Sequence, residues 1–306
     1  MSRNAKVGLV ALVAVLIGIV LLGCAATAVG AALPGLGAGL GRKVAIVRVE
    51  GPISLASGNT WLLSTSATDR RVIADLHKAE ADPSVAAILL YVNSPGGSVV
   101  ASDEIYRAVK GCKKPVVAYF AEVAASGGYY VSCGAKRIVA HPDTMTGSIG
   151  VISEIVMAKG LLDKLGVTVE TVKSGPAKDM GSPARPLTPE EREILQGLID
   201  EAYQNFVDVV AAGRNLPREQ VLRLADGRVY SGRQALELGL VDQLGSMDDA
   251  VIVAGGLAGL KGVPQTKEMR SQASLMEVLL GVVTKPDPVS ALQQRLYPSL
   301  EYRLAP

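Results

Sequence analysis

The chain has 306 residues, with 31 basic and 29 acidic side chains, and hydrophobic residues make up 49% of it. This length allows one large domain or two ordinary ones, each with a full core. Because the charges nearly balance and no cluster of Lys and Arg stands among aromatic residues, nucleic acid is not expected as a partner. The two histidines, His77 and His141, are far apart and no cysteine or carboxylate cluster has ligand spacing, so we expect neither a metal site nor another cofactor.

The first 32 residues are predicted to attach the chain to a membrane. No charged residue occurs from Val7 to Gly41, and the stretch from Val7 to Leu22 is almost purely aliphatic. Because roughly 20 apolar residues cross the hydrocarbon layer, we expect a single transmembrane helix over residues 1–32, with the later residues outside the cytoplasm. An alternative stays open, because Leu21-Leu-Gly-Cys24 resembles a lipoprotein cleavage box, in which Cys24 carries the lipid. Residues 33–42 are expected to form a linker.

The middle of the chain alternates segments typical of strands with segments typical of helices. The continuous apolar run from Val85 to Val92 indicates a strand that is covered on both faces of a parallel sheet. The predicted strands are 43–50, 85–92, 115–120, 136–140 and 167–173, and the predicted helices are 69–78, 101–110, 158–165, 188–212, 217–224, 232–238 and 247–257. This βαβ order predicts an α/β fold with right-handed crossovers.

Two glycine-rich turns follow two of the predicted strands. They are Asn93-Ser-Pro-Gly-Gly-Ser98 and Val123-Ala-Ala-Ser-Gly-Gly128. Binding groups collect at the carboxyl ends of parallel strands, so we expect the two turns to be neighbours. Ser126 stands between small residues and ahead of a helix-like run, which is the setting of an exposed nucleophile at a strand-to-helix turn. The same serine could instead be an ordinary N-cap.

A serine nucleophile needs a base to take its proton, and the sequence offers a histidine, a lysine or a carboxylate, of which a carboxylate base acting on serine is uncommon. His141 lies between a predicted strand and a proline. Lys178 lies in a turn-rich loop of small residues over 174–183, where burial could bring its pKa toward neutrality. The residues alone leave the choice open, and Lys178 could also be one more surface lysine.

Two further features stay open at this point. Cys112 and Cys133 could form a disulfide in an oxidising compartment or could remain buried free thiols. The tail over residues 261–306 has prolines and isolated apolar clusters. We expect it to pack loosely, on a neighbouring chain or on the membrane surface, and assign it no chemistry.

Six short motifs make the chain resemble the signal peptide peptidase A family of bacterial serine proteases over residues 43–260. Each motif is weak alone, but their order and spacing together are highly specific. The motifs are Asn93-Ser-Pro-Gly-Gly97, Ala125-Ser-Gly-Gly-Tyr-Tyr130, Met145-Thr-Gly-Ser-Ile-Gly-Val-Ile152, Val172-Lys-Ser-Gly175 with Lys178-Asp179, Phe206-Val-Asp-Val209 and Asp226-Gly-Arg-Val-Tyr230. The resemblance implies a fold of the Clp-protease/crotonase type, which is a superhelix of repeated ββα units.

The resemblance also implies how the site is built. Ser126 would be the nucleophile and Lys178 the general base, and the Ser148 hydroxyl would orient the lysine amine. The backbone N–H groups of Gly97 and Gly127 would form the oxyanion hole. The implied protein is an endopeptidase tethered to a bacterial cell membrane. It would degrade cleaved signal peptides and other short hydrophobic peptides.

The resemblance further implies an assembly, and two rival interpretations remain. The implied assembly is a ring of identical protomers in which the lysine of one protomer completes the site of its neighbour. One rival interpretation is a related enzyme in which His141 serves Ser126 as the base. The other is a catalytically idle membrane scaffold.

Overall fold

The computed structural model describes residues 41–55, 67–269 and 301–303. Residues 1–42 form a unit of their own, so the fold is described for the unit that begins at Lys43. The predicted membrane segment and Cys24 lie outside the described residues. Within the described ranges, no helix is both long and apolar enough to cross a bilayer.

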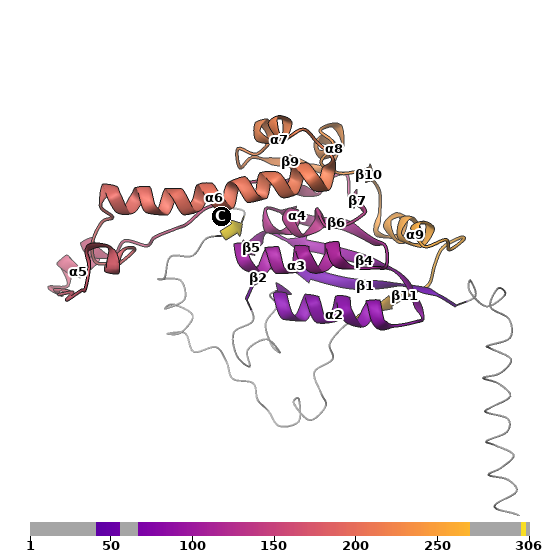
Figure 1. The fold of residues 1–306 in the computed structure, drawn as a ribbon, viewed down its shortest axis with the longest axis horizontal. Coiled ribbons are helices and arrows are strands. Elements are labelled where there is room, and N and C mark those ends of the chain that lie inside the picture. The colour runs from indigo at the N-terminus through magenta and orange to yellow at the C-terminus, as the bar shows by residue number, and fades with distance from the viewer. Residues whose placement is uncertain (1–40, 56–66, 270–300, 304–306) are drawn as a thin grey trace, which may run out of the picture. The chain divides into compact units, whose positions relative to one another are not determined.

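A mainly parallel sheet forms the centre of the larger unit (Figure 1). Its strand order is β10-β7-β6-β4-β1-β11, with β8 paired to the far end of β6 and β9 paired antiparallel to β8. The strands are β1 (Lys43–Glu50), β4 (Val85–Ser94), β6 (Val116–Ala125), β7 (Arg137–Ala140), β8 (Met145–Gly147), β9 (Val229–Ser231), β10 (Gln243–Leu244) and β11 (Thr266–Glu268). The predicted α/β class with a parallel sheet is therefore confirmed.

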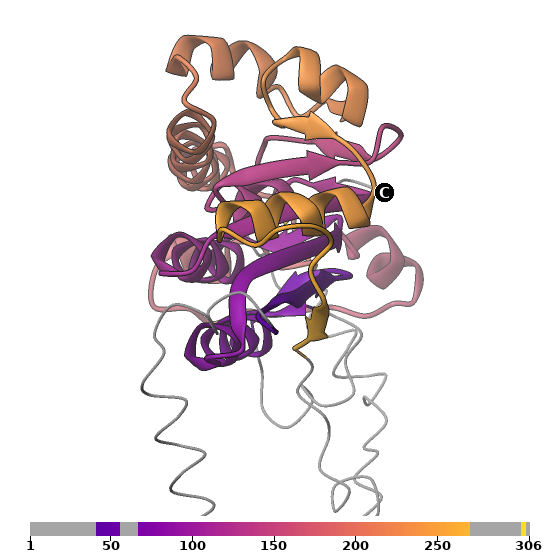
Figure 2. The ribbon, with the colours of Figure 1, turned by 90° about the vertical axis from the view of Figure 1, so that its right-hand side faces the viewer.

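Helices cover both faces of this sheet. The helices α2 (Asp69–Ala81), α3 (Val99–Gly111) and α4 (Gly127–Ser132) share one apolar cluster with Ala45 and Val47 of β1. The next side chains along the same strand, Val44 and Ile46, point the other way and pack with α9 (Met247–Leu257). Side chains alternate across a strand, so β1 carries apolar residues at four successive buried positions, Val44 to Val47. The helix α9 therefore covers the face of the sheet opposite to α2 and α3, and Figure 2 views the unit from the side on which α9 lies in Figure 1.

A second, small sheet joins distant parts of the chain. Its order is β12-β5-β2-β3, formed by β12 (Glu301–Arg303), β5 (Gly96–Ser98), β2 (Ile53–Ser54) and β3 (Ala67–Thr68). Strand β5 pairs parallel with β2 and antiparallel with β12. The C-terminal strand therefore lies directly beside the first glycine-rich turn.

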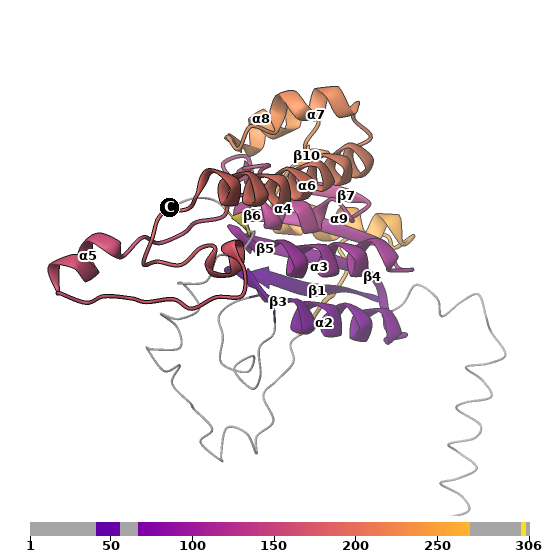
Figure 3. The ribbon, with the colours of Figure 1, turned by 60° about the vertical axis from the view of Figure 1, so that its left-hand side comes forward.

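Between Ile152 and the long helix α6, the chain leaves the body as an arm (Figures 1 and 3). We call residues 153–187 the arm, and it contains α5 (Lys159–Lys164) and the 3₁₀ helix η2 (Pro176–Asp179). Helix α6 (Pro189–Arg214) begins with a capping box and ends at Asn215 in the left-handed conformation. The helices α7 (Arg218–Leu224) and α8 (Gly232–Glu237) follow.

The predicted strand over 167–173 is wrong, because these residues form no strand in the structure. Its alternating valines pointed to a strand with one buried face, but they have no neighbouring strand to cover them. Val169 is 52% exposed and Val172 is 95% exposed. Alternation predicts a strand only where a partner strand is available.

Both cysteines within the described ranges are free thiols. The Cys112 thiol donates to the Ala108 carbonyl oxygen at 3.3 Å, and the Cys133 thiol donates to the Tyr129 carbonyl oxygen at 3.4 Å. Burial raises the pKa of Cys112 to about 11 and that of Cys133 to about 12. These cysteines are therefore protonated core residues and are not linked to each other.

Candidate active site

Ser126 sits at the junction between β6 and α4 in an unusual backbone conformation. Strand β6 ends at Ala125 and α4 begins at Gly127, so the chain turns sharply at the serine, which has φ 53° and ψ −116°. A positive φ is rare for a residue with a side chain, and such strain costs about 1–3 kcal/mol. Hydrogen bonds hold the turn, because the Ser126 N–H donates to the Gly147 carbonyl and the Tyr130 N–H donates to the Ser126 carbonyl, both at 2.8 Å.

The Ser126 hydroxyl is buried and unpaired. The residue is 0% exposed, and its Oγ has no hydrogen-bond partner among the described residues. It does not cap α4, although the residue occupies the N-cap position. A buried polar atom without a partner costs about 1–3 kcal/mol, and native proteins keep few of them. This cost marks Ser126 as a functional candidate rather than an ordinary cap.

The two glycine-rich turns meet, as the sequence predicted. A Cβ atom on Gly96 would lie 2.6 Å from the Gly127 backbone nitrogen and 2.0 Å from the Tyr302 carbonyl oxygen. A Cβ atom on Gly97 would lie 1.9 Å from the Ile53 carbonyl oxygen. Both glycines also have positive φ values, 95° and 156°. The backbones approach so closely here that no side chain fits between them.

Strand β8 carries Ser148 to the same place. Ala125 pairs with Gly147 in the parallel ladder between β6 and β8, and Ser148 is the next residue after that pair. Ser148 is itself in the left-handed region, with φ 49°, and its N–H donates to the Arg228 carbonyl at 2.8 Å. It is 7% exposed. The structure thus places Ser148 beside the turn that carries Ser126.

Lys178 is the one predicted site residue that lies on the arm rather than in the body. It lies in η2 on the arm and its side chain is exposed, whereas Ser126 is fully buried in the body. Since the serine Oγ has no partner among the described residues, the lysine amine is not bonded to it.

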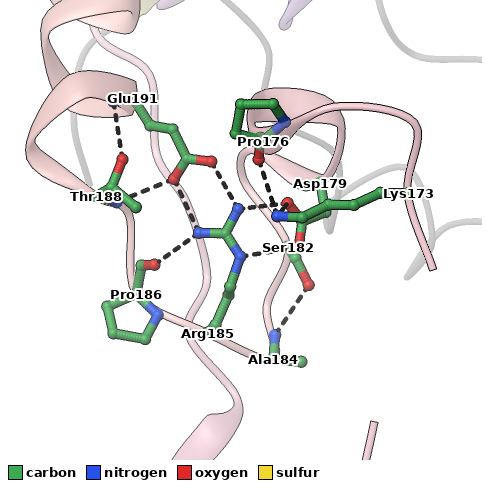
Figure 4. Close-up of polar contacts among 9 residues, drawn as sticks. All are labelled: Lys173, Pro176, Asp179, Ser182, Ala184, Arg185, Pro186, Thr188 and Glu191. Carbon is green, nitrogen blue, oxygen red and sulfur yellow. Dashed lines mark hydrogen bonds and ion pairs between the residues drawn. The ribbon is translucent and has the colours of Figure 1, made fainter. Parts of the chain in front are cut away.

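A cluster of charged side chains fixes the turn around Lys178 (Figure 4). The Arg185 guanidinium donates to both oxygens of Asp179 at 2.8 and 2.5 Å, and to both oxygens of Glu191 at 2.8 and 2.6 Å. The Lys173 amine donates to Asp179 at 2.6 Å. Arg185 therefore ties η2 to the first turn of α6, and we call this set of four side chains the arginine clamp.

The arginine clamp is a network of strong interactions. The Arg185 guanidinium, together with the Thr188 N–H, lowers the pKa of Glu191 to about 2. The same guanidinium and the Lys173 amine hold the pKa of Asp179 well below its ordinary range. Glu191 is also the capping-box residue of α6, with its side chain only 4% exposed. One carboxylate therefore serves both the helix start and the clamp.

His141 takes no part in this arrangement. Its side chain is exposed, and its Nδ1 accepts the Asp143 N–H at 3.2 Å within a local turn. The unpaired Ser126 Oγ shows that this histidine is not bonded to the serine either. Within the described residues, no group of three or more potential ligands could hold a metal ion.

The contribution of the C-terminal strand β12 has no counterpart among the motifs of the sequence. Tyr302 pairs with Gly97, and Glu301 forms an antiparallel bridge with Ile152. This part of the tail, for which the sequence predicts no chemistry, thus lies against a proposed oxyanion-hole residue. Three residues at the end of a long tail have no periodicity, so pattern analysis could not find them.

The fold and this serine turn define an α/β serine peptidase, and comparison with known proteins agrees. The sequence profile of peptidase family S49 matches residues 108–261, and that of the Clp protease matches residues 62–146. This chain belongs to peptidase family S49.

Three relatives illustrate the similarity. A Synechocystis protein named as a protease is 46% identical over 221 residues, covering 72% of this chain and 76% of the relative. An Enterococcus faecium protein named as a signal peptide peptidase SppA is 43% identical, covering 69% of this chain and 62% of the relative. A Methanocaldococcus jannaschii protein named as a protease is 48% identical, covering 58% of this chain and 57% of the relative. The chain therefore spans less than two thirds of the last two relatives.

Proposed function

We propose that this serine peptidase cleaves peptides through an acyl-enzyme on Ser126, with Lys178 as the general base. One observation carries the proposal, namely the strained turn that holds a buried, unpaired serine hydroxyl beside Gly97 and Gly127. The backbone strain at Ser126 and the missing hydrogen bond of its hydroxyl both destabilise the folded state. Such unfavourable features occur most often at active sites. The position of Ser148 beside this turn supports its proposed role in orienting the lysine.

The proposed reaction has two steps. The neutral Lys178 amine takes the proton from Ser126 as Oγ attacks the peptide carbonyl, and the N–H groups of Gly97 and Gly127 donate to the oxyanion. The lysine ammonium then protonates the leaving amine as the peptide bond breaks. In the second step, the lysine takes a proton from water as the water oxygen attacks the acyl carbon, and the lysine ammonium then returns this proton to Ser126 Oγ as the ester bond breaks. We therefore expect the rate to rise with pH along a limb that reports the lysine.

We infer that the lysine reaches the serine of a neighbouring protomer within a homo-oligomeric ring. The lysine sits on a projecting arm and is not bonded to the serine of its own chain. The arm also exposes many large apolar side chains, as an interface would. These are Val156, Met157, Leu161, Leu165, Val167, Val169 and Val172. The mainly parallel sheet of the body and the Clp-protease match over residues 62–146 support the repeated ββα superhelix of the Clp type.

The proposed substrates are signal peptide remnants and other short hydrophobic peptides at a membrane surface. The name of the Enterococcus relative supports the substrate class. The apolar composition of residues 1–32 supports a membrane tether, with lipidation of Cys24 as the alternative. In either form the catalytic domain would lie outside the cytoplasm.

Three single substitutions test this function on the full chain. We expect Ser126→Ala and Lys178→Ala to abolish hydrolysis of a fluorogenic hydrophobic peptide, while His141→Ala keeps it. Full activity in both of the first two variants would refute the assignment. Loss of activity in His141→Ala alone would favour the enzyme in which His141 is the base. If the unsubstituted chain shows no hydrolysis that depends on Ser126, the catalytically idle scaffold would be favoured.

Mixing the two inactive variants tests whether the site is shared. Ser126→Ala supplies a lysine and Lys178→Ala supplies a serine, so refolding them together would create some complete sites if the two groups come from different protomers. We expect partial recovery of activity. No recovery would place both groups within one chain.

A further inference from the structure

One small polar side chain lies on the buried face of helix α3. The buried residues of this helix follow helical spacing, and they are Ala101, Ser102, Ile105, Tyr106 and Val109. Ser102 stands near the start of the helix, shortly after the turn that contains Gly97, and the residue is 0% exposed. Alanine would satisfy the packing at this position, so the hydroxyl needs another explanation.

The Ser102 hydroxyl has no hydrogen-bond partner among the described residues. A serine inside a helix usually points to solvent or donates to the carbonyl four residues earlier, and Ser102 does neither. A buried hydroxyl without a partner destabilises the folded state, and native proteins keep few of them. Ser102 shares this unfavourable state with the proposed nucleophile, Ser126, and both residues adjoin Gly127.

The Ser102 hydroxyl faces the backbone of Gly127. A Cβ atom on Gly127 would lie 2.6 Å from the Ser102 Oγ and 3.1 Å from the Gly96 Cα. At the first residue of a helix, both the Cα–Cβ bond and the free N–H bond point back past the start of the helix. The Ser102 Oγ therefore lies on the side of Gly127 to which its N–H group points, and this is the space proposed for the oxyanion.

A neutral carbonyl oxygen fits into the same space. The carbonyl oxygen of Tyr302 lies 3.0 Å from the Cβ position of Gly127 and 2.0 Å from that of Gly96. The Ser102 hydroxyl is nevertheless not bonded to this oxygen. An uncharged carbonyl group can therefore occupy the space without engaging the hydroxyl.

We propose that Ser102 is a third donor to the oxyanion, with its hydroxyl joining the N–H groups of Gly97 and Gly127 on the charged oxygen of the tetrahedral intermediate. The inference rests on the proposed function and adds a residue to its site. The peptide oxygen carries little charge before attack and becomes an anion when the Ser126 Oγ adds to the carbonyl carbon. The hydroxyl is shielded from solvent, so its bond to the oxygen strengthens as the charge develops. Its contribution therefore belongs to kcat rather than to KM.

The kinetics of Ser102→Ala test the donor. We expect kcat on a fluorogenic hydrophobic peptide to fall about 10- to 100-fold, the effect of one hydrogen bond to a charged group, with KM changed less than about twofold. The rising limb of the pH profile should keep its position, because the proposed base is untouched. An unchanged kcat, with hydrolysis that still depends on Ser126, would overturn the inference and leave the proposed function intact. Hydrolysis that survives in Ser126→Ala would refute the proposed function instead.

Thermal unfolding separates this role from a structural one. Ser102→Ala removes an unpaired buried hydroxyl, so its Tm should rise by about 2–4 °C while kcat falls. Thr68→Val is the matched control, because the Thr68 Oγ1 is also buried without a partner, and β2 separates its strand β3 from β5. The control should gain a similar Tm and keep its kcat. A fall in both the Tm and the kcat of Ser102→Ala, or an equal loss of kcat in the two variants, would contradict the inference, because damage to the fold would then explain the lost activity.

Two larger side chains separate the hydrogen bond from packing. Threonine keeps a hydroxyl, whereas the thiol of cysteine is only a weak donor. We expect the kcat of Ser102→Thr to exceed that of Ser102→Cys at least about threefold. An equal or higher kcat in Ser102→Cys would show that the side chain merely fills space beside Gly127, and it would overturn the inference.

A peptide boronic acid gives a measurement that does not depend on turnover. The Ser126 Oγ adds to boron as Lys178 takes its proton, and the resulting tetrahedral anion places an oxygen where the oxyanion would lie. We expect the Ki of this inhibitor to rise about tenfold in Ser102→Ala and to stay unchanged in Thr68→Val. Equal Ki values in Ser102→Ala and the unsubstituted chain would refute the third donor.

Discussion

At the scale of single residues, the site depends on backbone approaches that only glycine permits. Gly96 and Gly97 have positive φ, and a Cβ atom on either would come within 2.0 Å of a backbone oxygen. A backbone oxygen in a paired strand cannot move aside as a flexible side chain can. The glycines therefore set the distance between the two turns, and with it the position of the proposed oxyanion donors.

We predict that Gly97→Ala lowers kcat by about two to three orders of magnitude, the cost of losing one oxyanion donor. The Cβ atom would meet the Ile53 carbonyl oxygen at 1.9 Å and force β5 away from β2. Gly197→Ala is the control, because nothing lies within 4 Å of its Cβ position in α6. The control should keep its kcat and gain roughly 0.5–1 kcal/mol in unfolding free energy. A normal kcat in Gly97→Ala would show that its N–H group is not required.

Ser148 gives a second prediction at this scale. If its hydroxyl donates to the neutral amine of Lys178, it favours the unprotonated base, and Ser148→Ala removes this preference. Less neutral amine would then be present at a given pH, and the rising limb of the kcat profile would shift to higher pH. Ser132→Ala is a matched control, since that buried hydroxyl donates to the Gly128 carbonyl at 2.8 Å and serves the helix alone. An unshifted limb in Ser148→Ala would exclude the orienting role.

At the scale of elements, the sequence predicted those parts of the fold that one local pattern defines. The run from Val85 to Val92 is apolar at every position because helices cover both faces of β4. The sequence of this run was therefore sufficient to predict a buried strand. The strand expected over 167–173 failed because its pattern requires a partner that the chain does not supply. The same distinction applies to the site. The serine turn is one continuous stretch of sequence, so a local pattern could predict it. In contrast, Tyr302 pairs with Gly97 across two strands that are far apart in the sequence, and periodicity does not encode such a pairing.

The arginine clamp gives a prediction about one element. Arg185 binds two carboxylates with its planar fork, and lysine cannot reproduce this geometry. We therefore expect Arg185→Lys to loosen η2, to misplace Lys178 and to lower kcat by about 10²-fold with little change in KM. Arg192→Lys, at an exposed position in the first turn of α6, should change neither constant. Equal activities of the two variants would show that the clamp does not position the lysine.

The clamp also has a defined dependence on pH. The pKa of Glu191 is lowered to about 2 in the folded chain, against about 4.3 for an ordinary glutamate. Its stabilising effect is therefore complete above about pH 5 and declines as the pH falls toward the folded value. Thermal unfolding should give Glu191→Gln and the unsubstituted chain similar Tm values at low pH. Above about pH 5, the Tm of Glu191→Gln should be the lower of the two. A constant difference across that range would mean that the charge on Glu191 contributes nothing.

At the scale of the whole molecule, the described chain holds the parts of the proposed site in two places. The serine turn and the proposed amide donors lie in the body, where they are buried and fixed by the sheets. The lysine lies on an arm that is internally clamped but otherwise exposes its apolar side chains. The ion pairs of the arm hold its conformation, while its apolar side chains remain exposed to solvent. These two properties suit the arm to docking against another copy of the chain.

Substitution of the arm tests this assembly. Val172 is 95% exposed in the single chain, so Val172→Asp should change the folding stability of the protomer by no more than about 0.5 kcal/mol. If the arm docks on a neighbouring copy, the new carboxylate would be buried without a partner and would oppose association. We expect light scattering to show dissociation to monomers together with loss of peptide hydrolysis. Val263→Asp, at a position 73% exposed outside the arm, should retain both the oligomer and the activity. An active oligomer in Val172→Asp would show that this part of the arm is not an interface, whereas an inactive oligomer would limit its role to placing the lysine.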